Sequence, residues 1–288
     1  MRLKVFSLFL AIQFASFALW QGVQALEQKN TTTPVVVSSM GSVGVNLEEP
    51  SASTPHEAAT PKLNALNRIR FSESSDSKNY QLLGGERKSE LMQVMDKLPN
   101  EHLSTLKNLI LDNNPQANRG LGGKSLIIIR GVDMDKPEEA AVLIHEIGHN
   151  VDLGYLNSPD NSTPSEFKDG RSVVYQGDPS LDFYRISWAN EKARSKTAVN
   201  FDFVSGYAMT DPFEDFAETY AYYVLHNQDF VSKAQTSEAL AKKYDYMKNE
   251  VFNGRVFDTG VTESGFALDQ RPWDVTVLSY DLNGFLNG

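Results

Sequence analysis

The segment DKPEEAAVLIHEIGHNVD, residues 135–152, carries the clearest structural signal in this sequence. Its opening, Asp135 to Glu139, is typical of a helix start, because proline suits the first turn and acidic side chains complement the positive end of the helix dipole. Apolar residues then recur at helical spacing, which places them on one buried face. These residues are Ala140, Ile144, Ile147 and Val151. We therefore expect a helix that ends near Tyr155.

This helix contains the pattern HExxH, from His145 to His149. Residues four apart lie one turn above each other, so both imidazoles project from one face and can hold a single zinc ion. Glu146 follows the first histidine, where its carboxylate can take a proton from a water during attack on a carbonyl. The alternative is two surface histidines on an ordinary amphipathic helix, since HExxH also arises by chance. The helix start, the apolar face and a preceding strand favour the zinc site.

A catalytic zinc site needs a third protein ligand and an open fourth position. The metzincin pattern would continue with glycine at 152 and histidine at 155, but this chain has Asp152 and Tyr155, so that class is excluded. A second helix is expected to open at Asp211-Pro212 and run to about His226, with Glu214 and Glu218 one turn apart on one face.

Either Glu214 or Glu218 can bind zinc while the other accepts a hydrogen bond from a ligating histidine. A capping box between Asp211 and Glu214 would explain the same residues without a metal. The spacing leaves this choice open. Tyr207 lies seven residues before Glu214. Its phenol can donate a hydrogen bond to the oxyanion of a tetrahedral intermediate, although taken alone it also fits a packed aromatic residue.

Read together, HEIGHNVD (145–152) and SGYAMTDPFEDFAE (205–218) resemble the catalytic domain of anthrax lethal factor and the related secreted Pro-Pro endopeptidases. The resemblance implies a zincin-like α+β fold with one zinc ion per chain. It makes His145, His149 and Glu214 the zinc ligands, which settles the choice between the two glutamates by analogy. The roles that it implies for other side chains are Glu146 as general base, Tyr207 as oxyanion donor, Glu218 as partner of a ligating histidine, and Asp152 as a further residue behind the ligands.

The same resemblance implies an edge strand, preceded by a glycine-rich turn, beside the cleft. The matching stretch here is Gly120 to Arg130, and its residues Gly122, Gly123 and Lys124 are the candidates for substrate binding. An extended peptide can add to such an edge as a further strand. The chain lacks the large delivery domains of lethal factor, so a self-delivering toxin is not expected.

The composition limits the functional classes. The chain has 288 residues, of which 41% are hydrophobic and 22% charged, enough apolar material for a substantial core. A net charge of −10 with no concentrated basic patch argues against a nucleic-acid partner. Cysteine is absent, which excludes disulfides, cysteine-based metal sites and a thiol nucleophile.

Three segments are expected along the chain. Residues 1–25 have a basic start, an apolar stretch and small residues before a cut, as in a signal peptide. The apolar stretch is shorter than a bilayer span, so we expect no stable membrane anchor after cleavage. Residues 26–84 are expected to form a disordered linker or pro-segment, and residues 85–288 the folded domain.

Within the folded domain, hydrophobic patterning predicts further elements. We expect a helix over Ser89–Leu98, strands over Leu106–Asp112 and Ser125–Arg130, and a helical stretch over Ser237–Phe252. Leu156–Gly206 is expected to be a long ordered loop, because it combines turn signals with several aromatic residues. The stretch Arg271–Leu286 is expected to pack back on the domain.

The sequence thus predicts an exported, monomeric zinc endopeptidase, secreted or periplasmic, that acts on peptides or proteins. One rival is an inactive binding protein with a structural zinc, closed by a fourth protein ligand such as His226, Asp152 or Asp215. The other rival is a zinc peptidase inhibited by the segment Leu26–Pro61, with His56 or a carboxylate on the metal.

Overall fold

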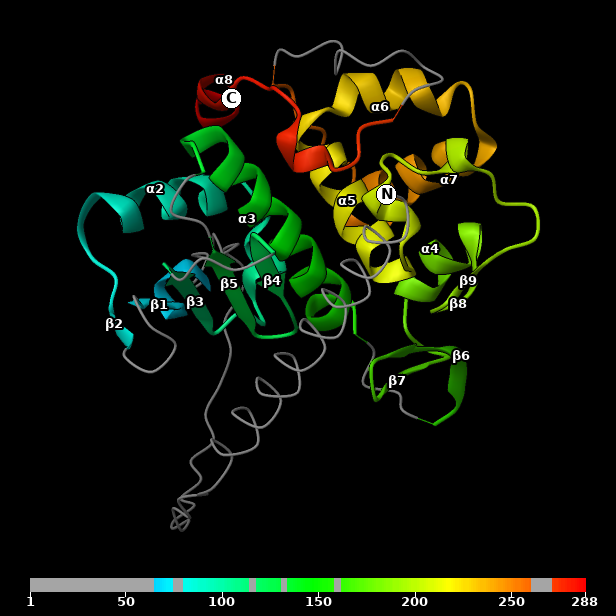
Figure 1. Cartoon of the computed structure of the whole chain (residues 1–288), viewed down its shortest axis with the longest axis horizontal. Coiled ribbons are helices and arrows are strands. Elements are labelled where there is room, and N and C mark those ends of the chain that lie inside the picture. Colours follow the sequence, from blue (N-terminus) through cyan, green and yellow to red (C-terminus); the bar gives the residue numbers. More distant parts are fainter. Residues whose placement is uncertain (1–64, 75–79, 114–117, 131–133, 158–161, 260–270) are drawn as a thin grey trace, which may run out of the picture. The chain divides into compact units, whose positions relative to one another are not determined.

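A five-stranded mixed sheet forms the first part of the computed structural model, which describes residues 65–74, 80–113, 118–130, 134–157, 162–259 and 271–288 (Figure 1). The strands are β1 (Arg70–Ser74), β2 (Tyr80–Leu82), β3 (Asn108–Asp112), β4 (Gly120–Gly122) and β5 (Leu126–Arg130), in the spatial order β2-β1-β3-β5-β4. The three central strands are parallel, and β2 and β4 are antiparallel edge strands.

The central strands are held by apolar side chains that face the helices. Leu109 pairs with Ile127 and Leu111 with Ile129, and all four side chains are buried. Strands rich in β-branched residues with helical cover suit the middle of a parallel sheet. The strands expected over Leu106–Asp112 and Ser125–Arg130 are therefore confirmed.

The expected boundary at Gly85 is wrong, because the sheet begins before it. Strand β1 pairs in parallel with β3, and β2 pairs with β1, so both belong to the folded core. Ser72 and Ser74 are buried in β1 despite their polarity, which explains why hydrophobicity did not reveal this strand. The predicted signal peptide and most of the predicted linker lie outside the described residues.

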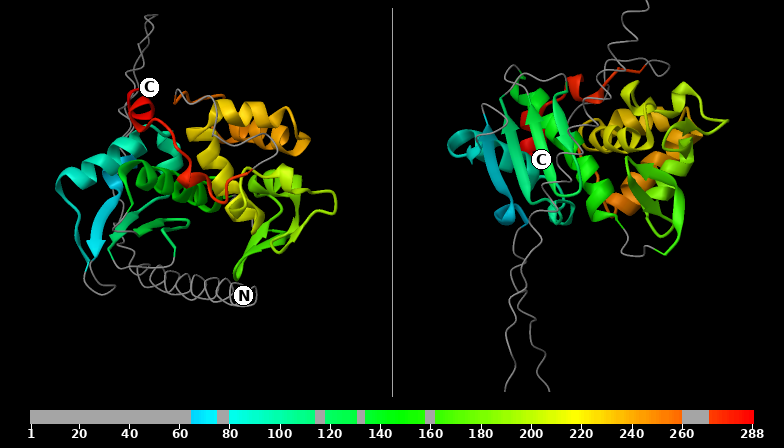
Figure 2. Two further views of the ribbon diagram at one scale, coloured as in Figure 1. Left: turned by 45° about the horizontal axis from the view of Figure 1, so that its top comes forward. Right: turned by 60° about the horizontal axis from the view of Figure 1, so that its bottom comes forward.

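Helices α2 (Gly85–Asp96) and α3 (Lys136–Asn150) lie on one face of the sheet, as Figure 2 shows. The Asp135 side chain accepts a hydrogen bond from the Glu138 N–H at 2.9 Å and caps α3. A single π-helical turn, η3 (Val151–Tyr155), continues the helix to its expected end. Every residue from Glu139 to Asn150 is buried, because α3 is covered by the sheet on one side and by α5 on the other.

Helix α5 (Pro212–Leu225) crosses α3 at very short distance. A Cβ atom placed on Gly148 would lie 2.9 Å from the Ala217 Cα, so the crossing requires a glycine on one helix and a small residue on the other. Asp211 caps α5 by accepting hydrogen bonds from the N–H groups of Phe213 and Glu214 at 3.0 and 2.9 Å.

The stretch Leu156–Gly206, expected as a loop, contains regular structure. It holds the hairpin β6 (Pro164–Asp169) and β7 (Ser172–Tyr175), helix α4 (Ser180–Ser187), the strand pair β8 (Trp188–Asn190) and β9 (Ala193–Arg194), and the 3₁₀ turn η4 (Asn200–Asp202). These elements are short, and the inward positions of β6 hold a single buried apolar residue, Phe167, between two half-buried polar ones, so the apolar period of a strand is weak.

The remaining described elements are mostly helical. They are the 3₁₀ turns η1 (Ala65–Arg68), η2 (Asn100–Leu103), η5 (Tyr207–Met209) and η7 (Val275–Val277), the helices α6 (Asn227–Ala234), α7 (Glu238–Tyr246) and α8 (Leu282–Asn287), and the π turn η6 (Met247–Val251). The described chain is thus an α+β fold. None of its helices has both the length and the apolar character needed to cross a membrane.

Two histidines in the core are held without charge. The ring of His226 lies near the rings of Tyr222 and Tyr280, and neither of its nitrogens has a hydrogen-bond partner among the described residues. Burial lowers the pKa of His226 to about 4. Burial also lowers the pKa of His102 to about 4, but the nitrogens of that ring contact Tyr220 Oη and the Val251 carbonyl, each at 2.8 Å.

We predict that His226→Phe makes the protein less sensitive to acid. In the wild type, the unfolded chain binds a proton below pH 6.5 that native His226 binds only near pH 4, so stability is full above 6.5 and falls as pH drops toward 4. The variant should remove up to about 3 kcal/mol of this pH dependence. Urea unfolding of both proteins at pH 7 and pH 4.5 measures it, and equal losses in the two proteins would contradict the prediction.

Candidate metal centre

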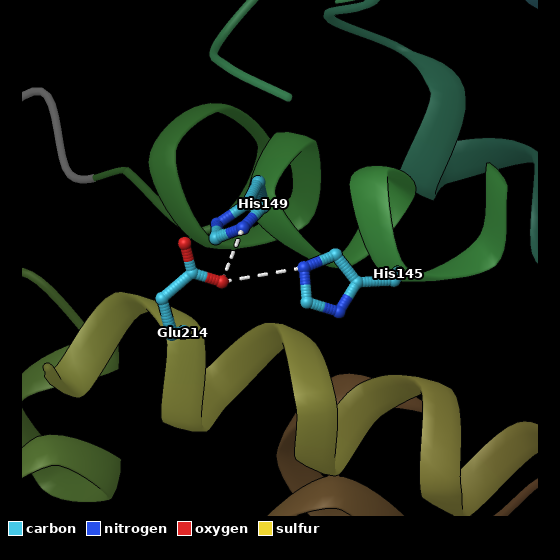
Figure 3. Close-up of side chains that lie close together, drawn as sticks. All are labelled: His145, His149 and Glu214. Carbon is cyan, nitrogen blue, oxygen red and sulfur yellow. Dashed lines mark ion pairs between the residues drawn. The ribbon is translucent and has the colours of Figure 1, made fainter. Parts of the chain in front are cut away.

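Three donor atoms from α3 and α5 converge on one point (Figure 3). His145 Nε2 lies 3.3 Å from Glu214 Oε2, and His149 Nε2 lies 3.2 Å from the same oxygen. Among the described residues, this is the group of histidine and acidic side chains with the spacing to hold a metal ion. The HExxH spacing puts both histidines on the face of α3 that meets α5.

The separations fit the ligands of one zinc ion. Two ligands bonded to zinc at about 2.0–2.1 Å with a tetrahedral angle lie about 3.3 Å apart. Glu214 Oε2 is buried and accepts no hydrogen bond from the described residues, although it faces two ring nitrogens. A buried carboxylate oxygen without a donor is costly, and a cation at this point would satisfy it. The donor set of two imidazoles and a carboxylate is also one that zinc accepts.

The other oxygen of Glu214 has a different partner. Tyr207 donates its hydroxyl hydrogen to Glu214 Oε1 at 2.9 Å, and the Tyr207 ring stacks on the His145 ring with centroids 6.1 Å apart. Asp211 caps α5 alone, and the Glu214 side chain instead faces Tyr207 and the histidines. The capping-box explanation of Glu214 is therefore not supported by the geometry.

Glu218 lies one turn further along α5 and is fully buried. Its Oε1 is 2.9 Å from His145 Nδ1, and its Oε2 accepts hydrogen bonds from the Ser205 hydroxyl at 2.5 Å and the Val275 N–H at 3.0 Å. A carboxylate that receives Nδ1–H fixes the imidazole tautomer that leaves Nε2 free for a metal. The sequence alone does not reveal the roles of Ser205 and Val275, because hydrogen bonds between distant segments leave no local pattern.

Glu146 lies beneath the edge strand β4. A Cβ atom on Gly120 would overlap Glu146 Oε1, and one on Gly122 would lie 2.6 Å from the Glu146 main-chain oxygen and 2.9 Å from the His149 Cβ. Both glycines therefore allow β4 to pass directly over the helix. Glu146 Oε2 is buried and has no hydrogen-bond partner among the described residues.

The glycine-rich stretch is itself the edge of the sheet, which corrects the expectation that it forms only a turn before an edge strand. Strand β5 is interior, between β3 and β4. One residue beyond each end of the β4–β5 pair, the Arg130 N–H donates a hydrogen bond to the Arg119 carbonyl and the Gly123 N–H donates one to the Leu126 carbonyl. Since antiparallel ladders alternate, the N–H and C=O groups of Gly120 and Gly122 point away from β5, toward the open edge.

Asn150 fixes the end of this edge to α3. Its side-chain NH₂ donates to the carbonyl oxygens of Gly123 at 3.0 Å and Lys124 at 2.6 Å. Of the three residues expected to bind substrate, Gly122 lies against Glu146 and His149, whereas Gly123 and Lys124 are at the adjoining turn.

Three residues considered as a fourth, closing ligand lie outside the donor group. Tyr184 donates a hydrogen bond to Asp152, at 2.7 Å from each carboxylate oxygen. The Asp215 oxygens lie 2.9 and 2.6 Å from Lys243 Nζ. His226 packs among aromatic rings. None of the three belongs to the donor group in the described chain.

The charges around the donors hold Glu214 in the ionised form that metal binding requires, whereas the Glu214 charge raises the pKa values of His145 and His149, whose rings must lose a proton to bind a metal. Burial alone would raise the pKa of Glu214, but His149 and His145 outweigh it and hold that pKa below its usual range. The Glu214 charge and burial raise the pKa of Tyr207 well above its usual value. At neutral pH, Glu214 is thus ionised and Tyr207 keeps the hydrogen that it donates.

Comparison with known proteins gives one match. The profile of a family described as "Putative zinc-binding metallo-peptidase" (Peptidase_Mx) matches residues 141–270, a stretch that includes His145, Glu146, His149, Tyr207 and Glu214. No curated protein matches the chain. No solved structure matches it either. The match agrees with the donor set in suggesting a zinc-binding metallopeptidase, and the likeness to lethal factor and Pro-Pro endopeptidases stays a prediction from the sequence.

We predict that Glu214→Ala weakens zinc binding by more than the 10–100-fold typical of losing a residue behind a ligand, because it removes a direct donor. A role in helix capping alone would cost about 1 kcal/mol of stability and leave zinc binding intact. Competition titration against a chromophoric chelator measures the affinity, with the exposed Glu238→Ala as control. Wild-type affinity in Glu214→Ala would contradict the assignment.

Proposed function

We propose that this protein is an exported zinc endopeptidase of zincin-like fold. The observation that carries the proposal is the convergence of His145 Nε2, His149 Nε2 and Glu214 Oε2. Glu146, one residue after the first histidine, is buried, and its Oε2 has no hydrogen-bond partner among the described residues. The match to the metallopeptidase family supports it. The signal-like residues 1–25 support a location outside the cytoplasm, secreted or periplasmic.

Each side chain has a role in this proposal. Zinc held by His145, His149 and Glu214 would polarise the scissile carbonyl and increase the acidity of a neighbouring water. Glu146 takes the proton from the attacking water and passes it to the leaving amine. Tyr207 donates its hydroxyl hydrogen to the oxyanion that develops on the former carbonyl. Glu218 holds His145 in the tautomer that leaves Nε2 unprotonated.

The substrate is a peptide or protein segment in extended conformation. The open edge of β4 offers the main-chain groups of Gly120 and Gly122, so a peptide strand can pair with it beside the strand that covers Glu146. A peptide bound in this way would bring its carbonyl groups toward the donor cluster through main-chain contacts, without a specific side chain. The resemblance to lethal factor and the Pro-Pro endopeptidases supports the same site and the same roles.

The rival with a structural zinc predicts that a fourth protein side chain closes the site. Asp152 and Asp215 are engaged by Tyr184 and Lys243, and His226 lies outside the donor group, which favours an open fourth position and hence catalysis. The rival in which Leu26–Pro61 acts as an inhibitory pro-segment concerns residues outside the described part of the chain, and it is compatible with the same peptidase site.

We predict that Glu146→Gln retains one zinc ion per chain and loses cleavage by about 10²–10⁴-fold, since an amide cannot accept the proton. A library of quenched fluorescent peptides and metal analysis of the purified protein provide the two readouts. Glu238→Gln makes the same chemical change on the surface of α7 and should behave like the wild type. Full cleavage by Glu146→Gln, or loss of its zinc, would refute this role.

Tyr207→Phe separates the two possible uses of the phenol. If Tyr207 is the oxyanion donor, the Tyr207→Phe variant should have a kcat lower by about 10²-fold and a nearly unchanged zinc affinity. If its hydroxyl serves only to hold Glu214 Oε1, zinc affinity falls and the activity per bound zinc is kept. Tyr155→Phe, at a partly exposed tyrosine, is the control. Measuring kcat at saturating zinc beside the zinc affinity decides between these outcomes.

A further inference from the structure

Trp273 is a large, mostly apolar side chain that is partly exposed at the surface close to the candidate metal centre. Its side chain belongs to a residue that is 59% exposed, and its ring centroid lies 6.4 Å from that of Tyr207. The Tyr207 ring in turn stacks on His145. The three rings form a row that leads from a metal donor to the molecular surface.

Backbone contacts hold Trp273 in this position. The Tyr207 N–H donates to the Trp273 carbonyl at 2.6 Å, and the Gly206 N–H donates to the Pro272 carbonyl at 2.8 Å. The indole rests on Gly206, where a Cβ atom would lie only 2.5 Å from the Trp273 Cε3. The absence of a side chain at Gly206 therefore makes room for the indole, and two backbone hydrogen bonds connect the segment 272–273 to Gly206 and Tyr207.

Asp274 and Thr276, which follow Trp273, connect the same segment to Arg119 at the start of the edge strand β4. Asp274 forms an ion pair with Arg119, the residue before β4, and Thr276 Oγ1 accepts a hydrogen bond from Arg119 at 2.7 Å. Figures 1 and 2 show this C-terminal stretch between α3 and α5, and η7 contacts both helices. Trp273 is thus fixed between the Tyr207 turn and the beginning of the edge strand.

We propose that Trp273 determines specificity and selects peptides that carry a large apolar side chain close to the bond that is cut; this inference rests on the proposed peptidase function. Single exposed apolar residues are ordinary on protein surfaces. Trp273 differs because its backbone is hydrogen-bonded to the Tyr207 turn and its ring stands in a row with Tyr207 and His145. The ion pair of the next residue, Asp274, with Arg119 ties this segment to the start of β4, so a peptide that pairs with β4 would pass close to the indole. Burying apolar surface there favours a large aliphatic or aromatic side chain, with a gain of about 25 cal/mol per Å².

The test compares the full-length, zinc-loaded wild type with Trp273→Ala and Trp273→Phe on a positional-scanning library of quenched fluorescent peptides. The wild type should prefer large apolar side chains at one position near the cut. Trp273→Ala should lose about tenfold in kcat/KM for these peptides relative to matched alanine peptides, through KM rather than kcat. Trp273→Phe should keep most of the preference. Val277→Ala, at an equally exposed apolar residue of the same segment, should equal the wild type.

A binding measurement provides a readout without turnover. The best library peptide, labelled for fluorescence anisotropy, should bind zinc-loaded Glu146→Gln about tenfold more tightly than Glu146→Gln with Trp273→Ala. Zinc content and thermal midpoint show that the variants are folded. Cleavage by Trp273→Ala with an unchanged preference overturns the inference and leaves the peptidase function intact. A wild-type preference for lysine or arginine at that position overturns the apolar class, and no cleavage by the wild type overturns both proposals.

Discussion

The contact between Gly148 of α3 and Ala217 of α5 determines the geometry of the site. A Cβ on Gly148 would stand 2.9 Å from the Ala217 Cα, and protein interiors have no slack to absorb such an overlap. On either side of this contact, α3 carries His145 and His149 and α5 carries Glu214 and Glu218. Each pair is spaced by one helical turn, so one close crossing aligns both histidines with both glutamates.

Burial of the polar side chains around His145, His149 and Glu214 explains why each of them has a specific position. Polar groups removed from water need partners, and most of those here have them. Glu218 receives bonds from Ser205 and Val275 and faces His145, while one oxygen of Glu214 receives the Tyr207 hydroxyl. Glu214 Oε2 and Glu146 Oε2 are left without hydrogen-bond donors in the described chain. These two atoms lie where the proposed chemistry needs an acceptor for a cation and an acceptor for a proton.

Local sequence signals were sufficient for α3 and for the residues it carries. Helical apolar spacing, a helix-start pattern and HExxH act within one element, so they determine which face the histidines share. Residue spacing could not decide whether Glu214 or Glu218 is the zinc ligand, because both lie on the same face of α5. Tyr207, Ser205 and Val275 distinguish them, and these contacts come from segments up to 57 residues away.

The glycine-rich edge strand and the start of the sheet were less predictable for physical reasons. Gly120 and Gly122 suggest a turn when read locally, but they are needed because β4 passes directly over Glu146. The run Leu126–Arg130 suggests a strand, yet only the fold shows that it is interior rather than at the edge. Strand β1 has buried serines, which conceal it from any analysis of hydrophobic alternation.

A crystal structure of the zinc-loaded protein, with anomalous data collected at the zinc edge, tests whether α3 and α5 together hold one catalytic zinc ion. We expect a single anomalous peak at about 2.0–2.2 Å from His145 Nε2, His149 Nε2 and Glu214 Oε2, with no fourth protein ligand. A peak elsewhere, or one closed by a fourth protein side chain, would contradict it.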